Sequence, residues 1–257
     1  MKIFAHRGAS GNYPENTKSA ILEALNVGVD GIEVDIQSAL DDYMLIHDSW
    51  LDRTTSGHGK VSDFTAQQLS LLDAGNGEQI PTLQQLLDWN SNKTLLNIEL
   101  KHTFELEKFA TILNNNIAKG VITKGNILVS SFDHHQIHWL KNRLPWLHIG
   151  ALTSSIPLNY AQFAQQLNAY SVHVDKSFVN KAFVDDATAR GLQVYAYTVD
   201  RPEDMDFMLK IGVHGIFTNY PARSKKYLAN IITWVNGNLV DNLARAWWSL
   251  RIEICSI

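Results

Sequence analysis

Short apolar stretches alternate with longer amphipathic ones along most of the chain. Eight short stretches have the β-branched or alternating pattern of strands: residues 2–5, 31–37, 94–100, 126–131, 148–153, 170–175, 193–199 and 215–219. Between them, helical periodicity covers residues 15–27, 106–118, 134–143, 157–167, 181–190 and 202–210. Strands and helices in regular alternation predict an α/β fold, a closed (β/α)8 TIM barrel.

One segment interrupts this alternation. Residues 38–81 begin with a turn and a short strand at 43–47, continue with Gly, Ser and Asp clusters typical of loops, and end at Pro81 before a helical stretch at 82–89. We interpret the segment as a small insertion after the second strand. Residues 1–228 are therefore expected to form one barrel domain, and residues 229–257 a C-terminal extension of unassigned role.

The C-terminal extension is rich in tryptophan and has no place in the barrel pattern. It contains Trp234, Trp247 and Trp248. Contact with a membrane surface is one interpretation of these residues. Packing onto the barrel or onto a partner subunit is favoured, and a homo-oligomer is compatible with the sequence.

Composition excludes some classes of protein. The 257 residues are 45% hydrophobic and 19% charged, which is ordinary for a folded domain, and the net charge of −4 gives no basic footprint for a nucleic-acid partner. The single cysteine, Cys255, forms no internal disulfide. No stretch has the length of a signal peptide or a transmembrane segment, so we expect a cytoplasmic protein, unless a leader has been removed.

Acidic residues occupy one face of two predicted strands. In residues 31–37, Glu33 and Asp35 alternate with aliphatic side chains, and Glu99 does so in residues 94–100. Helices cover the outer face of a parallel barrel, so the acidic faces are expected to point inward, near the active-site mouth. Carboxylates buried together require a cation. The sequence favours a hard divalent ion, while pairing with Lys101 or Arg7 is the alternative.

Two of the ten histidines end strands at the same predicted mouth. His6 ends the first strand beside Arg7, and His47 ends the short strand at 43–47 beside Asp48. Imidazoles exchange protons near neutral pH, so these two are candidates for a general acid and a general base. The other eight histidines are expected to be surface or core residues.

Six motifs occur in a characteristic order: HRG at 6–8, PENT at 14–17, EVDI at 33–36, IHD at 46–48, NIELK at 97–101 and GIFTNYP at 215–221. This ordered set resembles the glycerophosphodiester phosphodiesterase family over nearly all of residues 1–225. Residues 51–83 also match the extra segment that the family carries after strand two. The resemblance implies one divalent cation, Mg²⁺ or Ca²⁺, held by Glu33, Asp35 and Glu99, with His6 and His47 as acid and base.

The resemblance also implies how the substrate binds. Arg7 and Lys101 would bind the phosphate, and Glu15 would orient a neighbour, either Arg7 or His6. The implied substrate is a small-molecule glycerophosphodiester, such as glycerophosphocholine or glycerophosphoethanolamine. Its hydrolysis yields glycerol 3-phosphate and an alcohol, which places the enzyme in lipid and glycerol metabolism.

Aromatic residues and departures from the family pattern concern the shape of the pocket. Phe132 and Tyr197 occupy positions where the family places aromatic side chains around the glycerol end, although ordinary barrel packing explains them equally well. The family often has Trp at the position of Tyr197, Asn at that of Asp200, and Asp at that of Asn219. None of these departures removes a ligand or a proton carrier.

Two alternatives compete with this function. A lysophospholipase D activity would use the same centre on a lysophospholipid, and it requires an apolar surface beside the mouth. A catalytically silent barrel would bind a phosphorylated ligand. The silent barrel is disfavoured because both histidines and all three acidic ligands are present.

Overall fold

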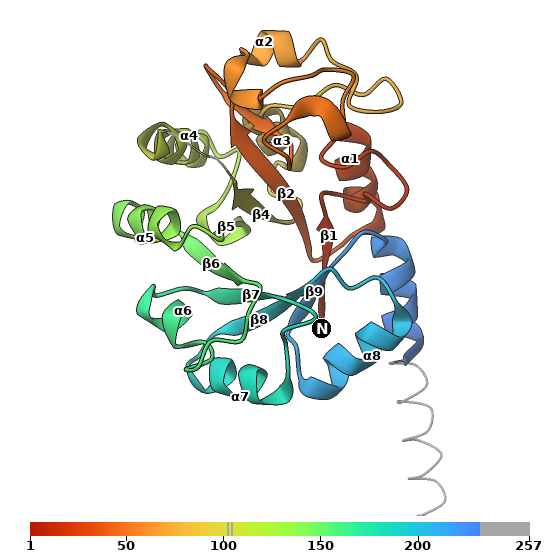
Figure 1. The fold of residues 1–257 in the computed structure, drawn as a ribbon, viewed down its shortest axis with the longest axis vertical. Coiled ribbons are helices and arrows are strands. Elements are labelled where there is room, and N and C mark those ends of the chain that lie inside the picture. The colour runs from red at the N-terminus through yellow and green to blue at the C-terminus, as the bar shows by residue number, and fades with distance from the viewer. Residues whose placement is uncertain (102, 104, 232–257) are drawn as a thin grey trace, which may run out of the picture. The chain divides into compact units, whose positions relative to one another are not determined.

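Residues 1–221 are built around a closed barrel of parallel strands (Figure 1). A computed structural model describes residues 1–101, 103 and 105–231. The barrel closes because β1 pairs with both β2 and β9. The strands that compose it are β1 (Lys2–His6), β2 (Gly31–Ser38), β4 (Leu95–Leu100), β5 (Ile127–Ser131), β6 (His148–Thr153), β7 (Ser171–Asp175), β8 (Gln193–Tyr197) and β9 (Gly215–Thr218). The predicted α/β fold, a (β/α)8 barrel, is confirmed.

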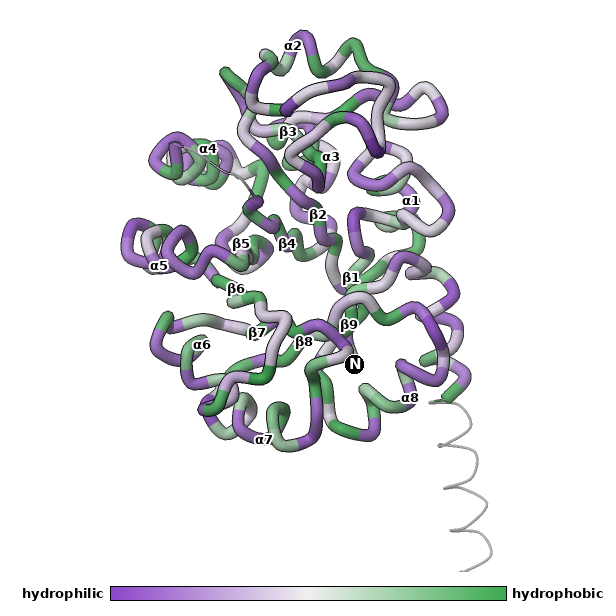
Figure 2. The backbone as a smooth tube through the Cα atoms, viewed as in Figure 1, coloured by the Kyte–Doolittle hydropathy of each residue, from purple (hydrophilic) through white to green (hydrophobic). Residues whose placement is uncertain are grey.

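Helices surround the strands and turn their apolar sides toward them. They are α1 (Lys18–Val27), α3 (Leu83–Asn90), α4 (Leu106–Ala118), α5 (His134–Arg143), α6 (Gln162–Gln166), α7 (Lys181–Ala189) and α8 (Pro202–Ile211), with a short 3₁₀ turn, η3 (Lys124–Asn126), before β5. Figure 2 shows hydrophobic and hydrophilic positions alternating along these helices. This is the pattern of elements that are buried on one side only.

Two helices are shorter than their sequence patterns predicted. Helix α1 begins at Lys18 rather than at residue 15, because Asn16 has φ of 60° and Thr17 is extended. Helix α6 covers Gln162–Gln166 only, because Tyr160, with φ of 45°, interrupts the expected stretch. Periodicity alone does not report a left-handed residue, which breaks a helix locally.

The alternation in β2 separates its two faces as expected. Ile32, Val34 and Ile36 have no exposed surface on the outer face. The parallel register of β2 and β4 places Asp35 opposite Glu99. Carboxylates that are distant in sequence therefore meet inside the barrel.

Aromatic and aliphatic side chains fill the lower part of the barrel. Phe4, Leu128, Tyr195 and Phe217 form one buried cluster. The ring centroid of Phe4 lies 4.8 Å from that of Tyr195 and 5.0 Å from that of Phe217. Because this apolar layer lies below them, the inward-facing polar groups near the carboxyl ends of the strands face the mouth of the barrel.

The insertion after β2 has a small core of its own. It contains β3 (Tyr43–Leu45), which pairs antiparallel with β2, the 3₁₀ turns η1 (Leu51–Arg53) and η2 (Val61–Asp63), and α2 (Ala66–Leu69). Six apolar residues bury each other there: Met44, Ile46, Leu51, Val61, Leu69 and Ile80. Helix α2 was missed from sequence, although Thr65 and Gln68 form a capping box that signals it.

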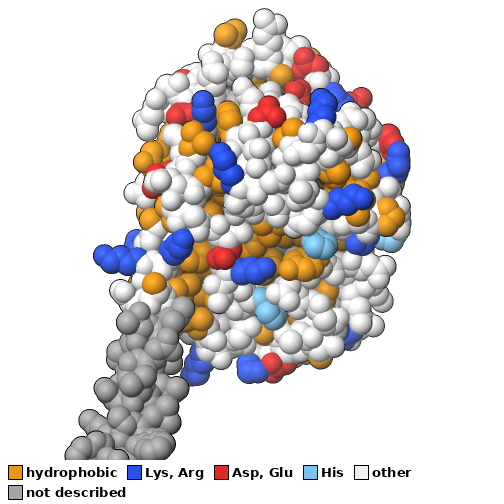
Figure 3. All heavy atoms as spheres, turned by 180° about the vertical axis from the view of Figure 1, so that it is seen from behind, with side chains coloured by type: hydrophobic (Ala, Val, Ile, Leu, Met, Phe, Trp, Pro, Cys, Tyr) orange, Lys and Arg blue, Asp and Glu red, His pale blue; other side chains and the backbone are white. Residues whose placement is uncertain are grey.

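The chain divides into two units, Met1–Pro221 and Ala222–Ile257. In the second unit, residues 222–231 are helical, and Trp234, Trp247, Trp248 and Cys255 lie outside the described residues. No helix in the described part of the chain combines the length and the apolar character that crossing a membrane requires. On the face in Figure 3, Lys and Arg are interspersed with Asp and Glu rather than gathered in one area.

Candidate active site

A cavity of about 130 Å³ opens at the carboxyl ends of the strands. Eight of the ten predicted site residues line it: His6, Arg7, Glu33, His47, Glu99, Lys101, Phe132 and Tyr197. The remaining two, Asp35 and Glu15, each lie against Arg7, at 3.1 Å and 2.9 Å respectively. The structure therefore gathers residues from β1, β2, β4 and β8 and from four loops at one place.

Three buried carboxylates meet at the edge of this cavity. One oxygen each from Glu33, Asp35 and Glu99 lies within 4.8 Å of the others. Burial and the neighbouring carboxylates raise the pKa of Glu33 well above its usual value, and burial and Asp35 raise that of Glu99 to about 7. Burial acts against ionisation of Asp35 as well, but Lys101 and Arg7 outweigh it and lower its pKa to about 2. The cluster thus has more negative charge than its own cations compensate.

The donor set fits a hard divalent cation. Glu33 Oε1 is buried and has no hydrogen-bond partner among the described residues, and the buried Asp35 Oδ1 is paired only as an ion, with Lys101. Carboxylate oxygens are the ligands that Mg²⁺ and Ca²⁺ prefer. Formal charges of −3 on the three acids and +2 on Arg7 and Lys101 leave −1, so a divalent ion would turn the centre positive and suitable for a phosphodiester.

The two candidate phosphate-binding cations are fixed by the same carboxylates. Lys101 Nζ lies 3.1 Å from Asp35 Oδ1 and also contacts Glu99. Arg7 Nε lies 3.1 Å from Asp35 Oδ2. Arg7 has φ of 57°, and its backbone N–H donates to Glu33 at 2.8 Å. This left-handed backbone is uncommon outside glycine and is held here by a buried carboxylate.

Hydrogen bonds determine which nitrogen of His6 faces the cavity. Asp200 accepts hydrogen bonds from the backbone N–H of Asn219 at 2.8 Å and from its Nδ2 at 2.7 Å, which assigns Oδ1 as the atom that faces His6. Asn219 Oδ1 lies 2.8 Å from His6 Nδ1 and therefore accepts from it. Nε2 of His6 is left to take up a proton. Burial and Arg7 lower the pKa of His6 to about 4.

Two of the departures from the family pattern, Asp200 and Asn219, together amount to an exchange of a carboxylate and an amide between two positions. From the resemblance we expect Asn and Asp at these positions, and here the residues are Asp and Asn. Because the two side chains contact each other, the exchange keeps one carboxylate and one amide in the pair. It changes the group that accepts from His6, which is a neutral amide oxygen in this chain.

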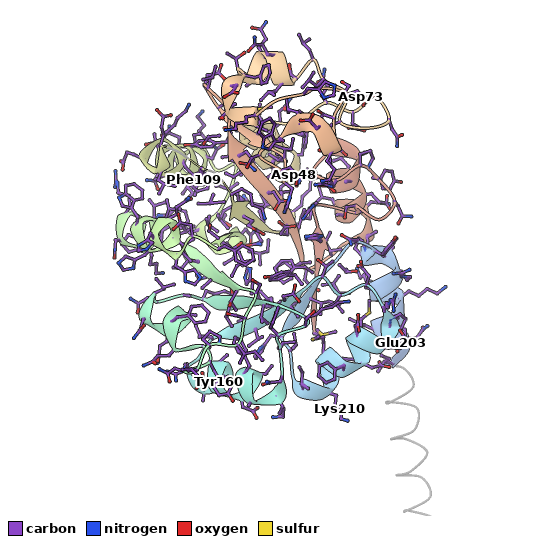
Figure 4. The ribbon with its side chains drawn as sticks, viewed as in Figure 1. Asp48, Asp73, Phe109, Tyr160, Glu203 and Lys210 are labelled. Atoms are coloured by element: carbon purple, nitrogen blue, oxygen red, sulfur yellow. The ribbon has the colours of Figure 1, made fainter. Side chains whose placement is uncertain are left out.

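His47 has a charged partner instead. Its Nδ1 lies 2.6 Å from Asp48 Oδ1. Arg53 donates to both oxygens of Asp48 and holds its pKa well below the usual range. An ionised carboxylate only accepts, so Nδ1 of His47 donates to it and Nε2 is left for a substrate. Figure 4 labels Asp48 on the part of the insertion nearest the barrel, whereas Asp73 lies farther out.

Aromatic side chains form the opposite part of the cavity wall. Phe132, after β5, and Tyr197, at the end of β8, meet edge to face with ring centroids 6.2 Å apart. The hydroxyl of Tyr197 donates to the carbonyl of Thr153 at 2.9 Å. This bond fixes the Tyr197 ring, and Phe132 stays 48% exposed.

Sequence reasoning missed some of the lining residues. Asn97 and His173 line the cavity and are almost fully buried, and each has a polar atom without a partner among the described residues. Asn97 shares the inward face of β4 with Glu99, so the alternation signal was there. His173 was treated as a surface or core histidine. Its Nε2 lies 2.9 Å from Ser171 Oγ, and its ring stacks obliquely against Tyr195 and Phe217.

His173 is expected to make stability depend on pH. Burial lowers its pKa to about 3 in the folded protein, against about 6.5 in an unfolded chain. The unfolded state therefore binds more protons below about pH 6.5, and stability falls as pH decreases toward the folded pKa. As the pH falls from about 6.5 to 5, this histidine should lower the free energy of unfolding by about 2 kcal/mol.

Urea unfolding of wild type and His173→Gln, both with chelator, measures this effect. Between pH 6.5 and 5, the free energy of unfolding of the variant should decrease by about 2 kcal/mol less than that of wild type. His58→Gln is the control, because His58 is largely exposed. Equal pH dependence in wild type and His173→Gln would show that the ring is not held neutral.

Comparisons with known proteins agree with this geometry. The sequence model of the glycerophosphoryl diester phosphodiesterase family matches residues 6–223. The chain belongs to this family. A glycerophosphodiester phosphodiesterase of Caldanaerobacter subterraneus is 36% identical over 228 residues, covering 85% of this chain and 94% of the relative. One of Bacillus altitudinis is 33% identical over 238 residues, covering 88% and 97%. As a member of the glycerophosphoryl diester phosphodiesterase family, the chain is an enzyme, a phosphoric diester hydrolase.

A solved structure supports the membership. The phosphodiesterase of Oleispira antarctica, in complex with the product sn-glycerol 3-phosphate, superposes with a TM-score of 0.81 at 28% identity, covering 89% of this chain and 97% of that one. The recognition of the family from its ordered motifs is therefore confirmed.

Proposed function

We propose that this enzyme hydrolyses small glycerophosphodiesters to sn-glycerol 3-phosphate and an alcohol by two-histidine acid and base catalysis. The observation that carries the proposal is one cavity lined by His6, His47, Arg7 and Lys101, with the acidic cluster at its edge. The names of the relatives, and the product bound in the Oleispira structure, support the same substrate class.

The size of the cavity favours a small substrate. A volume of about 130 Å³ accommodates a glycerol unit with its phosphate. The rings of Phe132 and Tyr197 form part of the cavity wall and limit its width on that side. A lysophospholipid carries in addition a long acyl chain, which a cavity of this volume does not hold. A glycerophosphodiester is therefore favoured over a lysophospholipid.

Glu33, Asp35 and Glu99 would hold a divalent cation, Mg²⁺ or Ca²⁺, whose charge, when bound, would stabilise the negative charge on the phosphoryl oxygens. Arg7 and Lys101 act on the same oxygens. The guanidinium of Arg7 offers a planar fork of donors, and Lys101 adds a point charge.

In the first step, His6 acts as base and His47 as acid. Nε2 of His6 takes the proton of the glycerol 2-hydroxyl, whose oxygen forms a bond to phosphorus. The bond from phosphorus to the head-group oxygen breaks, and Nε2 of protonated His47 gives that oxygen its proton. The roles follow from the partners of the two rings. Nδ1 of His47 donates to the carboxylate of Asp48, whereas Nδ1 of His6 donates to a neutral amide oxygen.

In the second step the two rings exchange roles. His47, now neutral, takes a proton from water, whose oxygen attacks the cyclic phosphate. The bond from phosphorus to the glycerol 2-oxygen breaks, and His6 returns its proton to that oxygen. The products are glycerol 3-phosphate and the free alcohol, and both rings are back in their starting states.

An assay with a substrate panel tests the proposal. Release of sn-glycerol 3-phosphate should be seen from glycerophosphodiesters with Mg²⁺ or Ca²⁺ present. Lysophospholipids should be hydrolysed at least about tenfold more slowly. A difference in how well a substrate fits its pocket commonly changes kcat/KM by this factor. Turnover of lysophospholipids alone would replace this function by the lysophospholipase D alternative.

A further inference from the structure

A second cavity, of about 380 Å³, lies where the insertion joins β2. Its lining residues come from the end of β2 and from the insertion: Gln37, Ser38, Ser49, Trp50, Lys60, Val61 and Ser62. None of them lines the first cavity. Two segments of the insertion, 49–50 and 60–62, form walls of the cavity and pair with each other. The N–H of Val61 donates to the carbonyl of Ser49 at 3.0 Å, and the backbones of Trp50 and Lys60 form an antiparallel β-bridge.

This cavity lies next to the candidate catalytic centre. Gln37 is two residues beyond Asp35 on the inward face of β2, a distance of about 7 Å along a strand. Gln37 Nε2 donates to the backbone carbonyl of His47 at 2.7 Å, and Ser49 follows His47 by two residues. His47 thus lines the first cavity, and its backbone carbonyl binds a residue that lines the second. If it protonates the leaving oxygen, the head group attached to that oxygen extends toward the second cavity.

The chemistry of the lining selects among head groups. Lys60 is the one charged side chain in it, as far as the described part of the chain goes. Its ammonium lies 5.6 Å from the centroid of the Trp50 ring, so the ring face that attracts a quaternary ammonium already has a cation on it. Ser49 and Ser62 add hydroxyl groups that pair with oxygen atoms.

We propose that this second cavity binds the head group of the substrate and selects one that is rich in oxygen, with several hydroxyls or a carboxylate, over trimethylammonium. The inference rests on the proposed function and extends it to substrate preference. Like charges at Lys60 and a choline head group repel, while a carboxylate or polyol gains a charge-assisted hydrogen bond.

Steady-state kinetics on three diesters test this inference: bis(glycero)phosphate, glycerophosphoserine and glycerophosphocholine. Wild type should have a kcat/KM at least about tenfold higher for the first two than for glycerophosphocholine, which corresponds to one well-placed charged hydrogen bond. Lys60→Met should remove most of that ratio, because it loses the cation that favours the first two diesters and the one that repels choline.

Lys124→Met is the matched control, because Lys124 lies 5.9 Å above the Trp146 ring just before β5, outside both cavities. It should leave the ratio unchanged. If none of the three diesters is hydrolysed with a divalent cation present, the proposed function fails. If they are hydrolysed but choline is equally good or better, or Lys60→Met keeps the ratio, the head-group inference alone is wrong.

A separate observation concerns Arg53, the last residue of η1 in the insertion. Its guanidinium binds two carboxylates at once. Nε and Nη2 lie 2.5 and 3.0 Å from the oxygens of Asp48, and Nη2 and Nη1 lie 2.8 and 3.1 Å from those of Glu15. Hydrogen bonds to Asp48 and to Glu15 raise the pKa of Arg53 further above its already high value.

Each of the two carboxylates also holds a residue of the active site. Asp48 accepts from His47, and Glu15 accepts from Arg7 at 2.9 Å. Glu15 thus lies against Arg7, one of its two expected partners. A planar guanidinium holds its donors in a fixed fork, so it fixes the separation of the two carboxylates. The insertion is thereby connected to both the proton carrier and the phosphate-binding side chain.

We infer that Arg53 is a positioning residue, which holds His47 through Asp48 and Arg7 through Glu15. This second inference also rests on the proposed function. In Arg53→Ala, kcat should fall and KM should rise, together about 10 to 100-fold in kcat/KM, because both groups lose alignment. Guanidinium ion added to the assay should restore part of the loss in Arg53→Ala.

Two comparisons separate positioning from stability. Asp48→Asn and Arg53→Ala should be non-additive when combined, because both act on His47 through one contact. Arg143→Ala is the control, since Arg143 also binds a carboxylate, Glu107, through two nitrogens and is equally exposed. Unchanged kcat/KM in Arg53→Ala would overturn the inference. So would a loss that follows a fall in Tm and that guanidinium does not rescue.

Discussion

Replacing Glu99 by glutamine is expected to lower kcat/KM for a glycerophosphodiester by about a thousandfold. The amide keeps an oxygen near Glu33 and Asp35 but removes one negative charge from the set that would hold the cation. Loss of that cation removes several kcal/mol of charge stabilisation on the phosphoryl oxygens, and each 1.4 kcal/mol is about tenfold in rate.

Two measurements check the Glu99 prediction. Titration calorimetry with Mg²⁺ and Ca²⁺ should show binding to wild type and none to Glu99→Gln, and chelator should stop wild-type turnover until the ion is restored. Glu107→Gln is the matched control, because Glu107 is an exposed carboxylate on α4 that pairs with Arg143. Turnover that chelator does not affect would reject the role of the cation.

Removing the imidazole of His47 is expected to reduce turnover by about 10² to 10⁴-fold on a diester with an aliphatic leaving alcohol. Such an alcohol leaves poorly without a proton. A nitrophenyl diester has a leaving group that needs none, so His47→Ala should keep much more of its activity on that substrate. The ratio of the two rates reports proton donation directly.

His6→Ala supplies the comparison for the His47 prediction. If His6 is the base of the first step, its loss should slow both diesters by similar factors, because attack on phosphorus is needed in each. Equal losses on both substrates in His47→Ala would reject the acid role of His47. Selective rescue of His6→Ala by the nitrophenyl group would show that the two roles are reversed.

Strand positions were predictable because alternation is local. Glu33, Asp35 and Glu99 were placed on inward faces by period alone, and the parallel register of β2 with β4 then sets Asp35 beside Glu99. Helix ends were less predictable. Asn16 and Tyr160 adopt positive φ, which loop contacts decide and periodicity does not express.

Pairings between distant loops could not be predicted from the sequence. Asp200 and Asn219 each departed from the family pattern, and only their contact explains the two departures together. Arg53 lies in a motif that sequence comparison identified, but its two partners come from different loops, so its position relative to them depends on tertiary structure. His173 resembled any core histidine until the cavity beside it was known.

The most direct test of the account is a crystal structure with Mn²⁺ and sn-glycerol 3-phosphate, with anomalous data at the manganese edge. The account predicts one anomalous peak in contact with carboxylate oxygens of Glu33, Asp35 and Glu99, and a phosphate that contacts Arg7 and Lys101 beside the rings of His6 and His47. A peak elsewhere, or a phosphate bound away from both rings, would contradict it.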